Sequence, residues 1–517
     1  MRNIQGLENA AMPYDAIIIG AGHNGLVAAA YLARAHQKVL VLERSDAIGG
    51  VAISEHPWAG WTVSAASYVV SLLHPDIVRD LDLEAHGYHA YLKDPHSFTV
   101  AQDGSSLLLW RNPEETRKEI SKFAPADVEG IAALDETLCT YAREIFDSFF
   151  AEEPRFDRLS SEAQAMFRGS AAEFVEHYVA TPMLQAAVAN DGIVGTFEGP
   201  RNPGTGYVLA HHFAGRVMGI QGAWGYVRGG MGSISTAVAT AARGSGAEIR
   251  TSAPVGMIVV EDGRAAGVVL EDGTQIESRY VLSNANPLTT FLELIPEKTL
   301  DSQFVKRVQD WRCEGPSMKL NLALGELPNF TARPSGESAP HHNATIHIAP
   351  DVDYLQRAYE DAKAGLPSTE PMLEMFLQTP SDFTLAPKGK HLLSIFAQYF
   401  PYTRKDGPWT DAQREAAADS IVNTIGKYAP NVPNAVEARQ ILTPVDLERR
   451  FGLPKGHIFH GELLPGQIFE DRFSVRTPLL GLYLCGSGTH PGGCVSGAPG
   501  VRGARAVIKD LAAVEAG

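Results

Sequence analysis

The sequence predicts an α/β protein of two domains, both assembled from separated segments of the 517-residue chain. Three observations carry this prediction. Near the N-terminus, a short apolar run leads into a glycine-rich turn and a helical pattern. A second glycine-rich block with strand-like runs starts at residue 222, and a third strand–turn–helix unit closes the chain from residue 482. Repeated units of this kind are typical of a doubly wound parallel sheet that carries helices on its faces.

The first unit, in residues 15–50, has the parts of a dinucleotide site. They are, in chain order, the apolar run Asp15–Ile19, the turn Gly20-x-Gly22-x-x-Gly25, the helical stretch 26–33, the apolar run Lys38–Leu42 and the acid Glu43. The glycines allow a tight turn and close approach of the backbone to a pyrophosphate, whose charge meets free N–H groups at the helix N-terminus. Glu43 stands where a carboxylate accepts hydrogen bonds from the adenosine ribose. The unit therefore predicts a Rossmann-like dinucleotide-binding domain.

The second and third units repeat this pattern. In the second, glycines at 229, 230 and 232 precede a helical stretch, and Asp-Gly turns at 262 and 272 favour antiparallel hairpins. The expected elements are a helix over 233–243 and strands over 248–252, 255–260, 265–270, 275–278 and 280–283. In the third, the apolar run 482–485 leads through a glycine-rich turn into a helix over 501–513, so a second helix N-terminus is available to an anionic ligand.

Glu43 also narrows the choice of dinucleotide. A carboxylate at this position repels the 2′-phosphate of NADP, which leaves NAD and FAD. The chain continues through Arg44 into the paired glycines Gly49 and Gly50. This extension resembles a flavoprotein group that includes amine oxidases and carotenoid desaturases, in which the glycine pair carries the chain past the cofactor. The resemblance favours FAD.

Composition excludes several functional classes. A formal net charge of −16 argues against a nucleic-acid partner, whose phosphates would be repelled. The four cysteines contain no C-x-x-C pair, and no second Gly-x-Gly-x-x-Gly unit is present, which argues against a disulfide oxidoreductase. We find neither a signal peptide in residues 1–13 nor a long apolar run that would span a membrane. We expect a cytoplasmic protein with at most peripheral membrane contact, and leave its oligomeric state open.

The remaining segments are expected to form a substrate domain. We assign residues 12–78, 222–290 and 478–517 to the FAD-binding domain, and residues 79–221 and 291–477 to the substrate domain. Within the latter, 113–190 looks helical, 318–324 and 391–400 look like strands of a mixed sheet, and 326–343 looks like a mobile surface loop.

Over almost its whole length the chain resembles the phytoene-desaturase-like flavoproteins, and within them the pyridine nucleotide-disulphide oxidoreductase domain-containing protein 2 subfamily. The shared segments are Ala21–Tyr31, Ala66–Tyr68, Gly204–Tyr207, Gln221–Tyr226, Gly229–Gly232, Val281–Asn284, Thr443–Glu448, Phe451–Pro454, Leu482–Gly488 and His490–Gly493. The resemblance implies a two-domain amine-oxidase-like fold, with FAD bound noncovalently between the domains. Cys494 departs from the family, because we expect glycine there; a thioether from this thiol to the flavin is the alternative to noncovalent binding.

The resemblance and the glycine units together assign the cofactor-binding positions. They are Gly20, Gly22, His23, Asn24, Gly25, Glu43, Arg44, Gly49, Gly50, Val51, Ala52, Ser67, Val255, Ser283, Asn284, Gly486, Ser487, Gly493, Cys494 and Val495. No metal site is predicted.

Three residues are candidates for catalysis. His490 lies in the last glycine turn, His211 follows the segment at 204–207, and Arg228 precedes the glycine pair at 229. A hydrogen bond that stabilises the turn is the alternative role of His490, and packing is the alternative role of His211. Trp224 and Tyr226 are candidates for lining an apolar substrate channel or for packing only.

The expected function is therefore FAD-dependent dehydrogenation of a small apolar substrate, such as an isoprenoid or carotenoid-like chain, by hydride transfer to flavin N5. The alternatives are an amine or amino-acid oxidase and a saturase or isomerase that uses reduced flavin. A flavoprotein with a regulatory role, or a protein that binds prenylated partners, is the non-enzyme alternative. Fold-level analogy does not fix the substrate.

Overall fold

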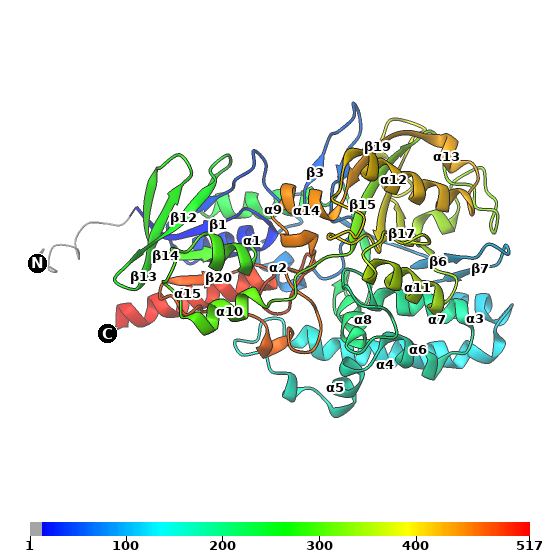
Figure 1. The fold of residues 1–517 in the computed structure, drawn as a ribbon, viewed down its shortest axis with the longest axis horizontal. Helices are drawn as coiled ribbons and strands as arrows, with labels where there is room; N and C mark the ends of the chain where they lie inside the picture. The colour runs from blue at the N-terminus through cyan, green and yellow to red at the C-terminus, as the bar shows by residue number, and fades with distance from the viewer. Residues whose placement is uncertain (1–12, 517) are drawn as a thin grey trace, which may run out of the picture.

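The computed structural model describes residues 13–516, which form two lobes side by side along the long axis of the molecule (Figure 1). The lobe at the left of Figure 1 holds β1, β12–β14, α1, α10 and α15. The other lobe holds the second large sheet and most of the remaining helices. The predicted first boundary, at residue 12, lies outside the described residues.

The first lobe is built on a seven-stranded sheet of order β11-β2-β1-β14-β13-β12, in which β20 also pairs with β14. Pairings among β11, β2, β1, β14 and β20 are parallel, and the β12–β13–β14 pairings are antiparallel. The strands are β1 (Tyr14–Ile19), β2 (Val39–Leu42), β11 (Glu248–Arg250), β12 (Val255–Glu261), β13 (Arg264–Leu270), β14 (Gln275–Ser283) and β20 (Leu482–Leu484). One expectation is corrected: the two runs 275–278 and 280–283 form the single strand β14, whose first part pairs with β13 and whose second part pairs with β1.

Helices cover both faces of this sheet. Alternate residues of β1 and β2 point to opposite faces, and both sets are apolar and buried, as expected for central parallel strands. One face packs against α1 (His23–Arg34), α9 (Gly232–Gly244) and α15 (Ala498–Ala516). The other face packs against α10 (Ser302–Gln309) and the π-helical turn Thr289–Glu293. The predicted doubly wound architecture is thus confirmed.

The second lobe is built on a seven-stranded sheet of order β19-β15-β18-β17-β16-β6-β7, antiparallel except between β16 and β6. Its strands are β6 (Ser97–Val100), β7 (Ser106–Leu109), β15 (Ser317–Leu324), β16 (Thr345–Ile348), β17 (Met372–Leu377), β18 (His391–Gln398) and β19 (Val436–Leu442). Every one of these strands falls inside the segments assigned to the substrate domain. The domain limits themselves stay a prediction.

The two faces of this second sheet differ in chemistry. Period-two alternation places Leu320, Ile395 and Met375 on one face, where they join the largest apolar core. The opposite face carries a buried row of mainly polar residues: Ser97, Thr99, Ser317, Lys319, Asn321, Thr345, His347, Glu374, Ser394 and Gln398. We call this side the polar face. A buried polar surface of this size points to a site, because buried polar groups destabilise a fold unless they have partners.

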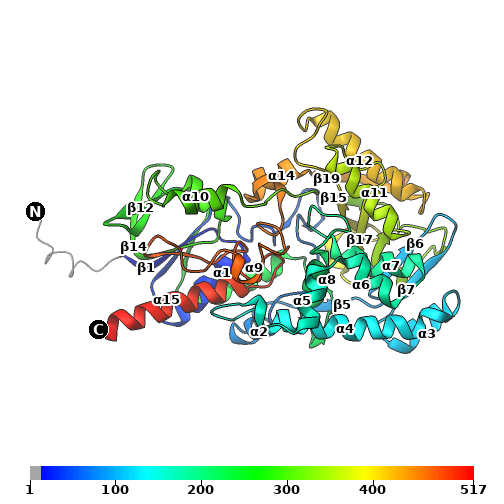
Figure 2. The same cartoon turned by 60° about the horizontal axis from the view of Figure 1, so that its bottom comes forward.

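Helices complete the second lobe, and the group α3–α8 lies together beside its sheet (Figure 2). These helices are α3 (Pro113–Ser121), α4 (Val128–Asp147), α5 (Ser161–Arg168), α6 (Ala171–Tyr178), α7 (Pro182–Ala189) and α8 (Thr205–Phe213). The second lobe also holds α11 (Val352–Lys363), α12 (Asp411–Gly426), α13 (Val432–Ala435) and α14 (Pro444–Phe451), whereas α2 (Pro75–Asp80) packs into the core of the first lobe through Ile77. Short two-stranded ribbons join β3 (Ser54–Glu55) to β4 (Val63–Ser64), β5 (Ala90–Leu92) to β10 (Gly225–Val227), and β8 (Arg216–Val217) to β9 (Ile220–Gln221).

The segment 326–343 corrects a second expectation. It is largely irregular, as predicted, but it is not a surface loop throughout, because Phe330, His341 and His342 are buried. Phe330 and His341 pack against Phe98 of β6. The two histidines contributed to the polar composition from which a surface loop was predicted, but both are buried at the edge of the core.

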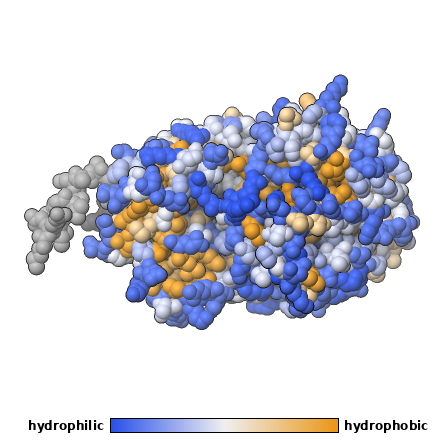
Figure 3. All heavy atoms as spheres, turned by 45° about the horizontal axis from the view of Figure 1, so that its top comes forward, coloured by the Kyte–Doolittle hydropathy of each residue, from blue (hydrophilic) through white to orange (hydrophobic). Residues whose placement is uncertain are grey.

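Within residues 13–516, no helix is both long enough and apolar enough to cross a bilayer. The face in Figure 3 is mostly hydrophilic, and its apolar side chains gather in separate areas rather than in a continuous band.

Candidate functional site

The turn between β1 and α1 has the geometry that a pyrophosphate requires. Gly20 has a φ of +93°, a left-handed conformation that glycine adopts without strain. A Cβ on Gly25 would lie 2.2 Å from the carbonyl oxygen of Gly20, so only glycine lets α1 pack this close to the turn. In the described structure, no side chain caps the N-terminus of α1 at Gly22. The free N–H groups and the positive helix end are therefore available to an anion.

Glu43 lies at the end of β2 and is 8% exposed. Its Oε2 accepts a hydrogen bond from Ala21 N at 2.8 Å, and its Oε1 accepts from the backbone N and the Oγ of Ser45 at 2.9 and 2.7 Å. The carboxylate thus fixes the glycine turn as well as standing at the predicted ribose position. Ala253 N donates to the carbonyl of Glu43 at 2.8 Å, which brings the start of β12, with Val255, to the same end of the sheet.

Residues from all three predicted blocks meet at this turn. Asn24 Nδ2 donates to Ser487 Oγ at 3.1 Å, and Asn284 Nδ2 donates to the carbonyl of Gly20 at 3.3 Å. Gly49 N donates to the carbonyl of Ala21 at 2.8 Å. The meeting point lies at the carboxyl ends of the parallel strands β1, β14 and β20, where open α/β sheets bind their ligands.

A cavity of about 130 Å³, here called the flavin cavity, lies beside this turn. One wall comes from predicted cofactor-binding residues: His23, Val51, Ser67, Ser487, Cys494 and Val495. The facing wall comes from Ser317, Met318 and Lys319 of β15, from Phe396 of β18, and from the segment 447–460. Two buried polar atoms at the turn, His23 Nε2 and Asn24 Oδ1, have no partner in the described structure. These residues fit a flavin ring bound between the two sheets.

Lys319 is the lysine among the titratable residues that the second lobe contributes to this cavity. It is 2% exposed, and its Nζ donates to Asn321 Oδ1 and Ser394 Oγ, both at 2.6 Å. Burial lowers the pKa of Lys319 well below its usual value. Burial also lowers the pKa of His23 to about 4 and that of His460 to about 3. His23 and His460 are therefore uncharged at neutral pH, and burial favours the uncharged form of Lys319.

Cys494 borders the flavin cavity with a φ of +71°, in the left-handed region that favours glycine. This explains why the family resemblance leads us to expect glycine there. Burial raises the pKa of the Cys494 thiol to about 12. All four cysteines are free.

Several predicted cofactor-binding residues lie behind the turn rather than on the cavity wall. Arg44 donates through Nη2 to the carbonyl of Arg450 at 3.2 Å, at the end of α14. Ala52 is buried and its carbonyl accepts from Ser235 Oγ at 2.7 Å, while Ser283 Oγ hydrogen-bonds to Thr290 Oγ1 at 2.7 Å. Gly50 packs against Gly22, and Gly486 and Gly493 pack against Asn284 and Phe459 respectively. These residues support the loops that border the site.

None of the three catalytic candidates lines the flavin cavity. His490 is buried, hydrogen-bonds through Nε2 to Ser148 Oγ at 2.9 Å, and packs against Phe469. His211 is buried between Tyr207 and Phe459, and burial lowers its pKa to about 3. Arg228 is exposed, and its backbone N donates to the carbonyl of His89 at 3.0 Å. The geometry thus favours the structural role of each histidine.

Sequence reasoning missed the residues of the polar face. Lys319 and Tyr68 border the flavin cavity, and Tyr68 donates to Glu374 Oε1 at 3.1 Å. The available signal was the alternation in Ser317–Leu324, which places Ser317, Lys319 and Asn321 on one side of a strand. A row of polar residues on one side of a strand indicates either that this side faces solvent or that it borders a buried site. The sequence alone does not distinguish these two possibilities.

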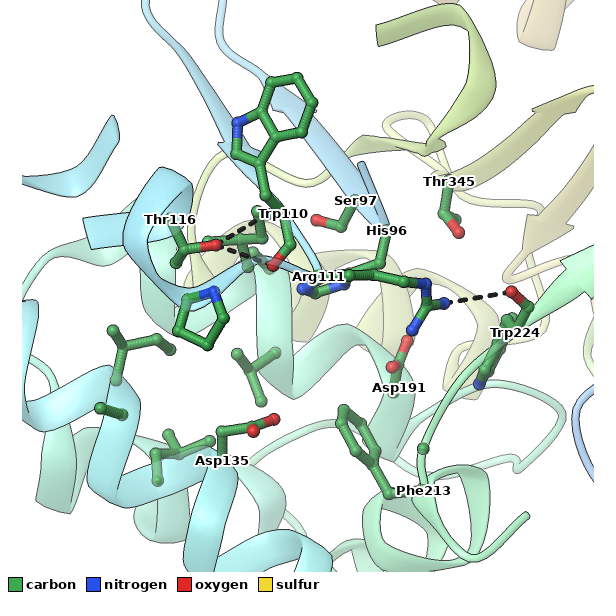
Figure 4. Close-up of a pocket in the computed structure, with 18 of the residues that line it drawn as sticks. His96, Ser97, Trp110, Arg111, Thr116, Asp135, Asp191, Phe213, Trp224 and Thr345 are labelled. Atoms are coloured by element: carbon green, nitrogen blue, oxygen red, sulfur yellow. Dashed lines mark hydrogen bonds between the residues drawn. The ribbon is translucent and has the colours of Figure 1, made fainter. Parts of the chain in front are cut away.

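A second cavity, of about 280 Å³, lies farther along the polar face (Figure 4). It is bordered by Lys93, Ser97, Arg111, Asp191, Thr345 and His347, and by apolar side chains of α4 and α7. Trp224 borders both cavities, so its indole forms part of the partition between them. Its Nε1 donates to the carbonyl of His212 at 3.2 Å.

Comparisons with known proteins identify the class that this fold and site define. The family of flavin containing amine oxidoreductases matches residues 25–308. Pyridine nucleotide-disulfide oxidoreductase domain-containing protein 2 of Mus musculus is 40% identical over 551 residues, covering 96% of this chain and 94% of its own. Hydroxyneurosporene desaturase of Rhodobacter capsulatus is 27% identical over 518 residues, covering 96% and 98%. Cyclohexylamine oxidase from Brevibacterium oxydans has the same fold, with a TM-score of 0.60 at 18% identity, covering 96% and 99%.

The chain belongs to the flavin containing amine oxidoreductase family. It is an FAD-dependent oxidoreductase, and the resemblance to desaturase-like flavoproteins inferred from its motifs is confirmed.

Proposed function

We propose that the protein dehydrogenates an apolar substrate, such as an isoprenoid or carotenoid-like chain. The observation that carries this proposal is the composition of the flavin-cavity wall that lies opposite the glycine turn. It is mainly apolar, with Met318, Phe396, Leu447, Leu453, Ile458 and Phe459. The name of the related hydroxyneurosporene desaturase points the same way.

Bound FAD supplies the redox chemistry, because its N5 accepts a hydride from a substrate C–H bond. The chain contributes position and the exclusion of water. The glycine turn, with Glu43 and Asn24, would hold the nucleotide half of FAD, and the cavity residues His23, Val51 and Val495 would lie beside its ring. An unactivated carbon chain makes little demand on an acid or base, which agrees with the absence of a charged carboxylate among the residues that border this cavity.

Amine oxidation is the second candidate, and Lys319 favours it. Removal of hydride from an amine proceeds best from the uncharged form, so a neutral base near the flavin assists it. Lys319 has the burial and the lowered pKa of such a base. Under this alternative, Lys319→Met lowers the rate of flavin reduction by an amine on the order of 10²-fold, the usual contribution of a general base.

Anaerobic stopped-flow absorbance separates the candidates. The FAD-loaded protein is mixed with a carotenoid-like polyene, a monoterpene, a primary amine or an alcohol of similar size. We expect loss of flavin absorbance with the polyene or the monoterpene. Reduction by the amine alone, slowed in Lys319→Met, contradicts the proposal and supports amine oxidation. A saturase or isomerase instead acts on the polyene only after the flavin has been reduced chemically.

A further inference from the structure

The second cavity has one apolar end and one polar end. The apolar end is bordered mainly by Val128, Ile131, Leu134 and Val188 of α4 and α7, with Asp135 beside them. The polar end is bordered by Lys93, Ser97, Arg111, Asp191, Thr345 and His347. In Figure 4, Arg111, Asp191, Thr345 and Trp224 lie toward one side of the cavity, and Asp135 lies toward the other. This division fits an amphiphile better than a wholly apolar molecule.

The polar end contains buried polar atoms that lack partners. His347 is 3% exposed, and neither of its ring nitrogens has a hydrogen-bond partner in the described structure. The same holds for Ser97 Oγ and for the adjacent Thr99 Oγ1 and Asn190 Oδ1. Buried polar groups are nearly always paired with protein or water. Their concentration beside one cavity indicates that a polar molecule or group completes them.

Arg111 is held rigidly, with one edge of its guanidinium free. Its Nε donates to the carbonyl of Lys93 at 2.6 Å, and its Nη2 donates to the carbonyl of Trp224 at 3.1 Å. Within residues 13–516, Nη1 has no acceptor, and no carboxylate lies within 4 Å of the guanidinium. A planar arginine fixed in this way is suited to a carboxylate, which accepts two parallel N–H bonds.

Lys93 lies beside it and also lacks an anionic partner. It is 1% exposed, and its Nζ hydrogen-bonds to Thr345 Oγ1. The Nζ lies 4.6 Å from the centre of the Phe376 ring and 5.2 Å from that of Trp224. The aromatic rings favour its charged form, whereas burial opposes it.

Two carboxylates face the same region and favour the charged form of Lys93, but within residues 13–516 neither lies within 4 Å of Lys93 Nζ or of the Arg111 guanidinium. Glu374 is fully buried behind the cavity, where it accepts from Tyr68 OH at 3.1 Å and lies 3.6 Å from His347 Nε2. Burial and the charge of Glu374 raise the pKa of Asp191 to about 7, so its negative charge is only partly present at neutral pH. His96, the other histidine at the cavity, is kept neutral by burial, which lowers its pKa to about 3. Arg111 is therefore the dominant fixed charge that borders this end.

We propose that the second cavity is a binding site for an apolar carboxylic acid, whose carboxylate pairs with Arg111 and Lys93 and whose hydrocarbon part lies along α4 and α7. Trp224 lies between this site and the flavin cavity, because it borders both. The inference deepens the proposed function, on which it rests, by naming a carboxylate-bearing apolar compound as the substrate class. Binding itself does not depend on the redox step.

Calorimetric titration of the FAD-loaded protein tests the site without turnover. The probes are decanoate, decylamine and decanol, which share a chain and differ in the head group. We expect decanoate to bind most tightly and Arg111→Gln to weaken it by about tenfold or more, because a hydrogen bond to a charged partner is lost. Arg117→Gln is the matched control: Arg117 borders the same cavity, but its Nη1 is paired with Glu129 Oε1 at 2.6 Å, and we expect less than about a twofold change.

Three results would overturn the proposal: tighter binding of decylamine, equal binding of all three probes, or decanoate affinity that is the same in Arg111→Gln and in the wild type. Since Arg111 also holds two backbone carbonyls, Lys93→Met is a second variant that weakens decanoate if Arg111→Gln does not fold. Failure of the polyene and the monoterpene to reduce the flavin in the stopped-flow experiment contradicts the proposed function but not the binding site, so the two failures are distinguishable.

Discussion

The two cavities differ in how the chain builds them. The flavin cavity takes one wall from residues beside the glycine turns, such as His23, Ser487 and Cys494, and local backbone conformation decides the geometry of that wall. The polar end of the second cavity joins Lys93, Arg111, Asp191 and His347, which come from separate segments of the substrate lobe. The comparison shows that backbone shape specifies the cofactor site, whereas long-range side-chain assembly specifies the second site. Mutations at the two places should therefore fail in different ways.

The largest effect is expected at Gly25, where backbone shape is decisive. A methyl group in Gly25→Ala would lie 2.2 Å from Gly20 O, and neither the turn nor α1 can move without displacing the other. We expect loss of most bound FAD, together with a destabilisation of about 1–3 kcal/mol or more. The absorbance ratio of flavin to protein and the thermal midpoint measure both effects.

Gly244→Ala is the matched control for Gly25→Ala. A Cβ at this position on α9 meets nothing within 4 Å, so FAD content should stay at the wild-type level. Full retention of FAD by Gly25→Ala would show that the turn does not determine cofactor binding.

Substitution of Glu43, which also belongs to the cofactor site, should have the second-largest effect on FAD binding. Glu43→Ala removes the acceptor of Ala21 N and of Ser45, as well as the predicted ribose contact. We expect FAD affinity to fall by ~1–3 kcal/mol, since these are bonds to a charged acceptor. Glu43→Gln keeps an oxygen that accepts from Ala21 N, so it should lose less. Equal FAD affinity of the wild type and Glu43→Ala, measured by fluorescence titration of the apoprotein, contradicts the assignment.

The same contrast explains how much of the protein was predictable from its sequence. The strand, turn and helix around Gly20–Gly25 follow from residues close together in the chain, and they appear where expected. The merging of two runs into β14 was not predictable, because one strand changes from an antiparallel to a parallel neighbour midway. Lys319 and Arg111 were missed for a related reason. Their burial depends on which distant segments cover the polar face, and no local pattern reports this.

The pH dependence of the free energy of unfolding tests the second cavity, because Lys93 is one of its buried titratable groups. Burial lowers its pKa to about 7, below the value of 10.5 expected in the unfolded chain, so the folded state binds fewer protons between these values. Wild-type stability should accordingly rise with pH over this window. Lys93→Met removes the buried amine and should stabilise the protein on the order of 1 kcal/mol at or below pH 7, a gain that shrinks toward pH 10.

Urea denaturation at pH 7 and pH 10 measures the difference between Lys93→Met and the wild type. Lys388→Met, at an exposed lysine, is the control and should show no change in this difference with pH. A gain for Lys93→Met that grows with pH would mean that Lys93 is stabilised as a cation by Glu374 and Asp191, and would place an internal ion pair where we propose a ligand.

Substitution of Cys494 should have the smallest effect on stability. It tests the backbone conformation at the border of the flavin cavity. The residue holds a φ of +71°, which strains a side chain by about 1–2 kcal/mol, so Cys494→Gly relieves strain but loses some packing at the cavity wall. We expect a net gain of less than ~1 kcal/mol and unchanged FAD content. The thiol has a pKa raised to about 12 by burial, and since the thiolate is the nucleophile, the flavin should stay noncovalently bound. Acid precipitation should then release all yellow colour from both proteins; colour retained by the wild type and released from Cys494→Gly would instead establish a thioether at this cysteine.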